Sequence, residues 1–531
     1  MTVSLRTVSP WRCSSFALLA AVSIASGARA ADGDKQTKAS SLEAGWQHGA
    51  FIEIFVRAYR DSDGDGIGDL RGLVSSLDYL QALGVRGIWL MPVTRSLDHD
   101  HGYAVSDYRD IEPAYGSLAD FDVLLAQAHQ RGIGVIMDYV INHGAADSQM
   151  FTAAKSSPAD PMRDWFVWRD SAPSGWLIMG KDPWVKTASG AYLAQFSATM
   201  PEFNLLNPAV MAFHEGNLRF WLDRGVDGFR FDAVTHLVEN GPDAWMDQPE
   251  NYRLMHQVRV LVTSYPRRYM VCEVTRHATR YAGDEACGSA FALEQAPELA
   301  AAARGSKQAI RSVARYFRDA PGSMATMASN HDLFAGERLW DQVRGDQRQY
   351  RLAAATYLLQ PGTPFIYYGE EVGMSSAAAL RGDPKLRTPM SWSAATPAAG
   401  FSSVAPFRRL SDNVSMQNVA SQEQAGAESL LAWYRELLRL RNRYPSIARG
   451  SYEAPFVQGR VMGFTRRLAG ETTRILINYG RRSSRVRLRD AGAAENLAQV
   501  FPADGRPPRI VGSTVTIPAQ SVLVLAAANP P

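Results

Sequence analysis

The sequence of 531 residues has few cysteines, almost no excess of charge and no apolar run long enough to cross a membrane. Three cysteines cannot form a disulfide-rich scaffold. Lysine and arginine total 56 against 53 acidic residues, and a formal charge of +3 does not indicate a nucleic-acid binder, which needs a basic face. The hydrophobic content of 46% excludes a disordered chain. At about 100–200 residues per domain, the length predicts two to four domains or one large barrel with attachments.

The N-terminus has the pattern of a secretory signal peptide. Two arginines precede a short apolar run at residues 16–25, and Ala-Arg-Ala at 28–30 provides small residues before a cleavage site. The alternative, a membrane anchor, is disfavoured because the run is about half of the roughly 20 residues that a spanning helix needs. We expect cleavage after Ala30, a secreted or periplasmic protein, and a loose polar leader at residues 31–44.

Helix-like and strand-like runs alternate from residue 51 to about 447. Residues 117–131 predict a helix that Ser117 caps, with an aspartate three residues later. Residues 207–224 predict another, which begins with Asn-Pro and ends before a glycine. Apolar strands are predicted between the helices, at 84–92, 134–141, 226–231, 269–274, 289–293, 325–329 and 364–368.

This alternation predicts an α/β fold with a parallel sheet covered by helices. About eight strands over roughly 400 residues favour a closed (β/α)8 TIM barrel, which we place at residues 45–450. A tryptophan-rich stretch at about 144–205, after the third strand, is too long for a plain loop and predicts an inserted subdomain. Residues 451–531 alternate strands with turns and predict a C-terminal antiparallel β-domain, a β-sandwich.

Ionisable residues stand where several of the predicted strands end. In a (β/α)8 barrel, chemistry is carried by residues at the C-terminal ends of the strands. A single carboxylate there is commonly a loop cap, but four such segments in chain order are hard to explain as caps, since clustered carboxylates shift each other's pKa. The four segments are Asp138–His143, Gly228–His236, Tyr269–Glu273 and Ser329–Asp332.

These segments, in this order, resemble the signature regions of glycoside hydrolase family 13, the α-amylase family. Residues 87–92, 200–204 and 364–371 agree with that resemblance, which runs from about residue 51 to 392. The sequence looks most similar to secreted bacterial α-amylases with oligo-1,6-glucosidase-like features. The resemblance implies cleavage of α-glucosidic bonds with retention of configuration, which needs a carboxylate and a carboxylic acid about 5–5.5 Å apart.

The match of motifs implies a role for each acidic residue. Asp232 corresponds to the nucleophile, Glu273 to the general acid and base, and Asp332 to a third carboxylate that binds sugar hydroxyls. Glu273 must then be protonated near neutral pH, so its pKa must be raised. Arg230, two residues before Asp232 and on the same face of the strand, should keep Asp232 ionised.

The resemblance also implies the substrate-binding residues. His143 and His331 match histidines that bind hydroxyls of the sugar at the cleavage point, and Tyr103 matches a stacking platform for that sugar. Asp100 resembles the residue that grips a terminal glucose in exo-acting relatives. The substrate expected on this basis is an α-glucan or maltooligosaccharide.

Residues 61–69, Asp-Ser-Asp-Gly-Asp-Gly-Ile-Gly-Asp, predict a calcium loop. Carboxylates at every second position around a glycine turn follow the first half of an EF-hand, although the twelfth position is glycine. A solvated acidic turn is the alternative, but four aspartates in nine residues would repel one another without a cation. Similar loops in oligo-1,6-glucosidase-like family members bind calcium. The candidate ligands are Asp61, Asp63, Asp65, the carbonyl of Ile67, and Asp69.

Two cysteines, Cys272 and Cys287, remain after the predicted cleavage. They would lie near neighbouring strands in an oxidising compartment, where a disulfide is plausible, but two buried thiols fit the sequence equally well.

The leading interpretation is a secreted, retaining α-amylase that acts on α-1,4-glucans as a monomer, with calcium and without a nucleic-acid or membrane partner. An α-glucosidase with transfer activity, or a trehalose-synthase-like enzyme, would share the chemistry up to the glycosyl-enzyme and differ only in the acceptor. A non-catalytic relative that serves as a binding subunit is disfavoured by the intact set of Asp232, Glu273 and Asp332.

Overall fold

The computed structural model describes residues 40–488, 497–502, 509–511 and 514–527. The predicted signal peptide and residues 31–39 of the predicted leader lie outside the described residues.

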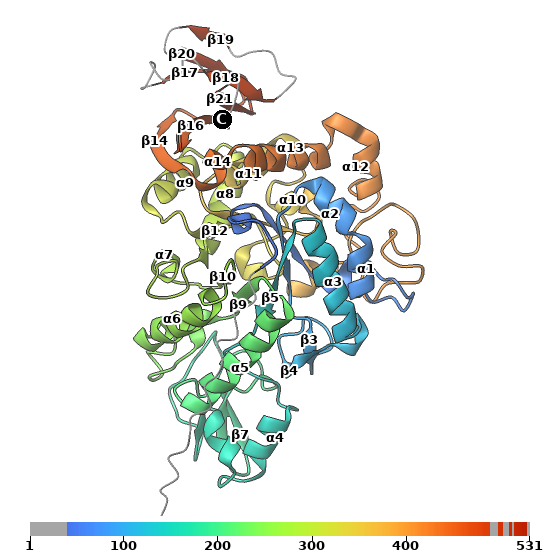
Figure 1. The fold of residues 1–531 in the computed structure, drawn as a ribbon, viewed down its shortest axis with the longest axis vertical. Helices are drawn as coiled ribbons and strands as arrows, with labels where there is room; N and C mark the ends of the chain where they lie inside the picture. The colour runs from blue at the N-terminus through green and yellow to red at the C-terminus, as the bar shows by residue number, and fades with distance from the viewer. Residues whose placement is uncertain (1–39, 489–496, 503–508, 512–513, 528–531) are drawn as a thin grey trace, which may run out of the picture. The chain divides into compact units, whose positions relative to one another are not determined.

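Eight parallel strands close into a barrel (Figure 1), in the order β1-β13-β12-β11-β10-β9-β5-β2. Each strand pairs with the next barrel strand along the chain, and the first also pairs with the last, since Phe51 lies opposite both Gly87 and Phe365. The predicted (β/α)8 fold is therefore confirmed. The strands are β1 (Phe51–Ile54), β2 (Gly87–Leu90), β5 (Gly134–Tyr139), β9 (Gly228–Phe231), β10 (Tyr269–Cys272), β11 (Ala290–Phe291), β12 (Met324–Thr326) and β13 (Thr363–Tyr367).

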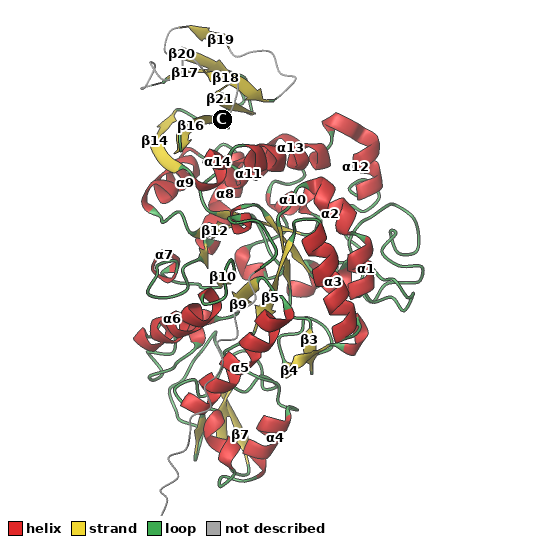
Figure 2. Cartoon of the chain, in the orientation of Figure 1, coloured by secondary structure: helices red, strands yellow, loops and turns green. Residues whose placement is uncertain are grey.

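Helices surround these strands (Figure 2), and their apolar side chains share one buried cluster with residues of the barrel strands. They are α1 (Leu70–Ser75), α2 (Leu77–Leu83), α3 (Leu118–Gln130), α5 (Pro208–Arg224), α6 (Pro249–Thr263), α7 (Ala278–Tyr281), α8 (Ala296–Ala303), α9 (Lys307–Asp319), α10 (Leu339–Gln342), α11 (Gln347–Leu358), α12 (Val419–Ala425), α13 (Leu430–Arg443) and α14 (Pro445–Arg449).

The two helices predicted in most detail begin as their sequences indicate. Ser117 Oγ accepts a hydrogen bond from the N–H of Asp120, whose carboxylate accepts one from the N–H of Ser117, which forms a capping box at α3. The side chain of Asn207 caps α5, and Gly225 ends it in a left-handed conformation at φ 114°. Both caps satisfy backbone groups that would otherwise lack partners.

An inserted subdomain follows β5, the third barrel strand, as predicted. It contains α4 (Gln149–Ser156) and a sheet in the order β6-β8-β7, made of β6 (Trp168–Arg169), β7 (Trp184–Thr187) and β8 (Gly190–Leu193). Aromatic rings form its core, since Phe151 stacks on Trp168 with ring centroids 5.7 Å apart and Trp176 meets Trp184 at 5.5 Å. A second hairpin, β3 (Thr94–Ser96) and β4 (Val105–Ile111), follows β2 and carries the loop with Asp100 and Tyr103.

Two antiparallel sheets form the C-terminal domain. Their orders are β14-β15-β16-β21-β18 and β17-β20-β19. Residues of both sheets share one apolar cluster, which includes Leu476 and Leu525 from the first and Val486 and Val515 from the second. The strands are β14 (Ser451–Gln458), β15 (Val461–Leu468), β16 (Glu471–Asn478), β17 (Ser484–Arg487), β18 (Leu497–Phe501), β19 (Arg509–Val511), β20 (Thr514–Ile517) and β21 (Ser521–Ala527).

The end of the predicted leader is packed rather than loose. Ser40 Oγ donates a hydrogen bond of 2.7 Å to Asp227 Oδ1, and the carbonyl of Leu42 accepts one from Arg267. The side chain of Leu42 is buried in an apolar cluster with Trp46. The predicted boundary at residue 44 is therefore too late, because the apolar Leu42 and the buried Asp227 both draw this segment onto the barrel.

In the part of the chain that the structure describes, no helix combines the length and the apolar character that crossing a membrane requires.

Candidate active site

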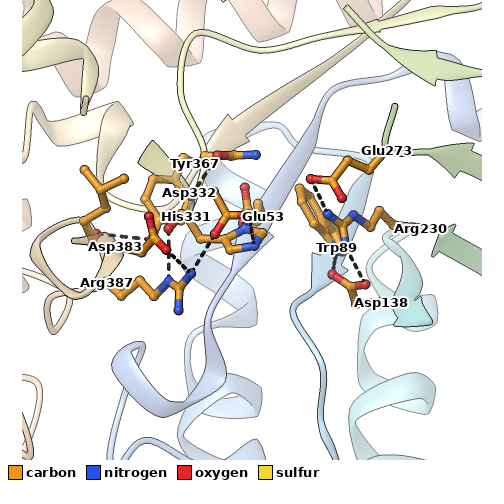
Figure 3. Close-up of polar contacts among 12 residues, drawn as sticks. Glu53, Trp89, Asp138, Arg230, Glu273, His331, Asp332, Tyr367, Asp383 and Arg387 are labelled. Atoms are coloured by element: carbon orange, nitrogen blue, oxygen red, sulfur yellow. Dashed lines mark hydrogen bonds and ion pairs between the residues drawn. The ribbon is translucent and has the colours of Figure 1, made fainter. Parts of the chain in front are cut away.

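The C-terminal ends of the barrel strands bring together the side chains that the sequence singled out. Arg230 lies on β9, Asp232 follows that strand directly, and Glu273 follows β10. His331 and Asp332 follow β12 (Figure 3). Parallel strands place their carboxyl ends at one rim of the barrel, so residues far apart in the chain share one site.

One buried guanidinium joins the carboxylates of three strands. Arg230 is fully buried, and its Nη1 lies 2.7 Å from Asp138 Oδ1 and 2.6 Å from Asp232 Oδ1. Its Nη2 lies 2.9 Å from Glu273 Oε1, close enough for an ion pair although the angle does not suit a hydrogen bond. A buried cation that faces three acids offsets the cost of burying them and fixes their relative positions.

Glu273 has the environment of a carboxylic acid rather than a carboxylate. It is 7% exposed, and its Oε2 accepts a hydrogen bond of 3.0 Å from the N–H of Ala233. Burial, reinforced by the nearby charge of Asp232 and opposed by Arg230, raises its pKa to about 8. Glu273 therefore carries a proton at neutral pH.

Asp332 has the opposite environment. Its Oδ2 lies 3.0 Å from His331 Nε2, and its Oδ1 accepts a hydrogen bond of 2.6 Å from Arg387 Nη2. Although burial would raise it, the pKa of Asp332 is held well below its usual range by these two cations. Glu273 and Asp332 thus differ in protonation because one is desolvated and the other is paired.

Tyr103 and His331 lie together between these acids. Their rings stack with centroids 5.5 Å apart, and the Tyr103 hydroxyl lies 2.8 Å from His331 Nε2. The same hydroxyl donates a hydrogen bond of 2.9 Å to Asp138 Oδ2. Tyr103 is 8% exposed, so only part of its ring is available to a sugar.

His143 is buried, as its place at the end of β5 implies. Burial lowers the pKa of His143 to about 4, so the imidazole is neutral at physiological pH. Its Nε2 has no hydrogen-bond partner among the described residues, and its ring lies 5.3 Å from that of Phe196. An unpaired nitrogen of a neutral histidine is suited to a hydroxyl group of a ligand.

Asp100 makes a contact that the sequence does not reveal. Both of its carboxylate oxygens lie 2.7 Å from Arg408 Nη2. Arg408 also donates through Nη1 to the main-chain carbonyl of Arg387, the residue that contacts Asp332. Arg387 therefore links the Asp100–Arg408 ion pair to Asp332, the third carboxylate.

The acidic loop at 61–69 brings part of its predicted ligand set together. Carboxylate oxygens of Asp61, Asp63 and Asp65 all lie within 4.8 Å of one another. Asp69 points elsewhere: it caps α1, with Oδ1 accepting from the N–H of Gly72 and Oδ2 from that of Ser62. The loop rests on residues 401–407 through the pairs Asp61 N to Phe401 O and Phe407 N to Gly66 O.

Cys272 and Cys287 form a disulfide, which decides between the two alternatives that their spacing allowed. The bridge lies directly before Glu273 in the chain and ties the end of β10 to the segment that leads into β11.

Three residues of the site were not recognised in the sequence: Glu53, Arg387 and Arg408. A fourth, Asp138, was noted at the start of one strand-end segment but was given no role, and Glu53 left only a weak signal as an acid within an apolar strand. Arg387 and Arg408 lie in an irregular stretch, where neither periodicity nor spacing indicates their partners.

Comparisons with known proteins agree with this geometry. The profile described as "Alpha amylase, catalytic domain" matches residues 53–450. A protein named "Probable alpha-glucosidase" from Rhizobium meliloti is 33% identical over 504 residues, which cover 83% of this chain and 91% of the relative. A trehalose synthase/amylase of Mycolicibacterium smegmatis is 32% identical over 77% of this chain and 78% of its own. The crystal structure of an α-amylase from H. orenii superposes with a TM-score of 0.77 at 31% identity, over 91% of this chain and 99% of that one.

The fold and the paired acids define a retaining glycoside hydrolase. The chain belongs to glycoside hydrolase family 13, the α-amylase family, as the resemblance of its motifs implied.

Proposed function

We propose that the protein cleaves α-1,4-glucosidic bonds through a covalent intermediate on Asp232. In the first step, Asp232 attacks the anomeric carbon while Glu273 gives its proton to the leaving oxygen, so that a glycosyl ester forms and the aglycone departs as an alcohol. In the second step, the Glu273 carboxylate takes a proton from water, whose oxygen attacks the anomeric carbon. The bond from that carbon to Asp232 breaks, the sugar leaves with a free hydroxyl, and Asp232 and Glu273 return to their starting states. The raised pKa of Glu273 supports its assignment as the acid.

The neighbouring residues fit the charge that develops during this reaction. Asp332, kept ionised by His331 and Arg387, would stabilise the positive charge on the sugar ring in the transition state. Arg230, whose Nη1 lies 2.6 Å from Asp232 Oδ1, would hold the nucleophile in position. His143 and Tyr103 would bind hydroxyls and the face of the same sugar.

We infer that the substrate is held by its non-reducing end. The observation that carries this inference is the Asp100–Arg408 ion pair, which joins two loops next to Asp332 and its partner Arg387. An ion pair that closed one end of the substrate site would leave room for a terminal sugar rather than a continuing chain. This favours an α-glucosidase that removes glucose from chain ends. An α-amylase that cuts internally, the interpretation first drawn from the sequence, is the second candidate because the chain resembles proteins of both names.

A comparison of two maltoheptaosides tests this proposal, one with a free non-reducing end and one with that end blocked. We expect release of glucose from the free form and no cleavage of the blocked one. Cleavage of both at similar rates would support the α-amylase instead. Proton NMR of the first product should show the α-anomer, because two displacements retain the configuration.

The acceptor decides between hydrolysis and transfer. With maltose as the substrate, glucose alone indicates hydrolysis, longer oligosaccharides indicate transfer, and trehalose indicates an isomerase. All three outcomes pass through the same intermediate on Asp232. The experiment therefore identifies the molecule that accepts the glucosyl group and does not test the nucleophile.

We also propose that residues 61–69 bind Ca²⁺. The three neighbouring carboxylates of Asp61, Asp63 and Asp65 are hard oxygen donors of the kind that calcium prefers. The ion would relieve their mutual repulsion and stiffen the loop against residues 401–407. The carbonyl of Ile67 would add a further oxygen, whereas Asp69, whose carboxylate caps α1 and accepts hydrogen bonds from Ser62, would hold the loop in place.

Export remains the proposal for the location of the protein. The signal-like N-terminus motivates it, and the disulfide between Cys272 and Cys287 supports it, because such bonds persist in oxidising compartments. Fractionation of expressing cells, with detection of a mature N-terminus at Ala31, tests both the export and the cleavage site.

A further inference from the structure

Glu53 is a charged residue in the middle of an apolar barrel strand. Strand β1 reads Phe-Ile-Glu-Ile, and the side chain of Glu53 is only 1% exposed. Burying a carboxyl group without a partner costs free energy, so the contact that this group makes is informative about its role. That partner is His331, whose Nδ1 lies 2.5 Å from Glu53 Oε1 (Figure 3).

The other nitrogen of the His331 ring is directed into the candidate active site. Nε2 lies 2.8 Å from the Tyr103 hydroxyl and 3.0 Å from Asp332 Oδ2. The Tyr103 hydroxyl gives its own proton to Asp138, so its oxygen must accept from His331. Nε2 therefore carries a hydrogen, and the contact with Glu53 determines whether Nδ1 is protonated as well.

We propose that Glu53 is a positioning residue that keeps His331 doubly protonated, so that Nε2–H faces Asp332 and Tyr103 as a charged donor. One proton lies between Glu53 and Nδ1, and it belongs on the imidazole because a histidine is intrinsically more basic than a carboxylic acid. Asp332 on the other side of the ring favours the same charge.

The electrostatic environment of the pair agrees with this assignment. Burial lowers the pKa of His331, but Asp332 and Glu53 outweigh it and raise the pKa to about 10. The remaining groups that face the pair come from each element packed against it: the Trp89 ring from β2, Asp138 from β5, Arg230 from β9, Tyr367 from β13 and Arg387, which donates to the carbonyl of His331. Asp138 is a further acid, but it pairs with Arg230 and meets Nε2 through the Tyr103 hydroxyl, so it does not take the place of Glu53 at Nδ1.

The consequence for the reaction is that His331 and Asp332 act as an ion pair over the whole working range of pH. The cation holds Asp332 ionised and oriented, which the stabilisation of the sugar cation requires. Without the charge of Glu53, the pKa of His331 would fall, and the histidine would become neutral within the working range. This inference rests on the proposed function, since Asp332 matters only where a glycosidic bond is broken.

The test is the pH dependence of Glu53→Gln. The ratio of kcat/KM of the wild type to that of E53Q should be small near pH 5, where His331 is protonated in both proteins. Above the lowered pKa of His331 in E53Q, this ratio should grow by up to about tenfold per pH unit. A ratio that stays constant from pH 5 to 8 would show that Glu53 has a packing role alone and would overturn the proposal.

Glu371→Gln is the matched control. Glu371 is fully buried and accepts a hydrogen bond of 2.9 Å from Tyr79, but it contacts neither His331 nor Asp332. We expect E371Q to lower stability without a pH-dependent loss of kcat/KM. A wild type that is inactive on every α-glucoside would instead refute the proposed function, so the two failures are distinguishable.

Two further measurements do not rely on E53Q alone. In a His331→Gln background, E53Q should cause no further loss of kcat/KM, whereas additive losses would mean that Glu53 does not act through His331. If E53Q does not fold, ¹⁵N spectra of histidine-labelled wild type decide, with the His331 signal assigned from H331Q. Both ring nitrogens should be protonated at pH 8, and a neutral ring would contradict the proposal.

Discussion

Arg230 stands two residues before Asp232, and its Nη1 lies 2.6 Å from Asp232 Oδ1. Residues at i and i+2 of a strand share a face, so this contact follows from the local backbone. The same guanidinium reaches Glu273, which directly follows the neighbouring strand, β10. The two acids are therefore spaced by a common partner before any substrate binds, and this preorganisation is what a two-step displacement needs.

The replacement Asp232→Asn should abolish the reaction while leaving the fold intact. An amide cannot attack the anomeric carbon, and loss of a nucleophile lowers kcat by on the order of 10⁴-fold or more. The measurement is kcat on an aryl α-glucoside, with thermal unfolding as the control for folding. A variant that retained activity within tenfold of the wild type would refute the assignment.

The alkaline limit of activity should follow Glu273. This group must be protonated to act as an acid, and its pKa is raised to about 8 by burial. Activity should therefore be full below this value and fall as the pH rises through it. The pH profile of kcat/KM for the wild type checks this. The variant E273Q should lose most of the activity and should no longer show the decline at alkaline pH. Substrates whose leaving group needs no proton should be the exception to the loss of activity. An alkaline limb near pH 5 would contradict the assignment.

The replacement Asp100→Asn should weaken recognition of the chain end. It removes the negative charge that holds Arg408, so KM for maltose should rise, by roughly tenfold for a lost charged contact worth about 1.5 kcal/mol. The blocked maltoheptaoside should become a better substrate relative to the free one. Asp243→Asn, at an exposed aspartate on the surface, is the control and should change neither value. Equal effects of the two variants would argue against a closed end.

Removal of the disulfide should destabilise the protein. The bridge joins residues separated by 15 positions, and closure of such a loop contributes about 3 kcal/mol. Cys287→Ala should lower the free energy of unfolding in denaturant by an amount of this order. Reducing agent should have a similar effect on the wild type and none on C287A, and a wild type that is insensitive to reduction would contradict the expectation.

Calcium should raise the melting temperature of the protein. A ligand whose free concentration is 100 times its Kd stabilises the folded state by about 2.7 kcal/mol. Chelation of the calcium should remove that stabilisation. Asp63→Asn should abolish the response, because Asp63 is an exposed member of the cluster, while D243N should preserve it. If calcium leaves the melting temperature of the wild type unchanged, the loop is a solvated acidic turn.

The barrel was predictable because its signals are local. The capping box at Ser117 and the Asn-Pro start of α5 use neighbours three residues apart or fewer, and each strand is a short apolar run between such helices. The boundary of the leader was placed wrongly because Ser40 has its partner, Asp227, 187 residues away.

The site was predictable only as far as its motifs reach. Asp232, Glu273 and Asp332 could be located because each stands in a motif after the C-terminal end of a barrel strand. Arg408 contacts Asp100, 308 residues away in the sequence, and His331 contacts Glu53, 278 residues away. The residues around each of these positions do not indicate such distant partners. Asp69 shows a different limit, since an aspartate before a helix has the same spacing whether it caps the helix or binds a metal.

Arg387 serves two neighbours with different parts of the same residue: its guanidinium binds Asp332, and its carbonyl binds Arg408. A change in the backbone at this position would move the reacting centre and the chain-end contact together. Attempts to redesign the length of accepted substrates should therefore alter Asp100 or Arg408 and leave residue 387 unchanged, since any gain in selectivity made there would be coupled to a loss of turnover.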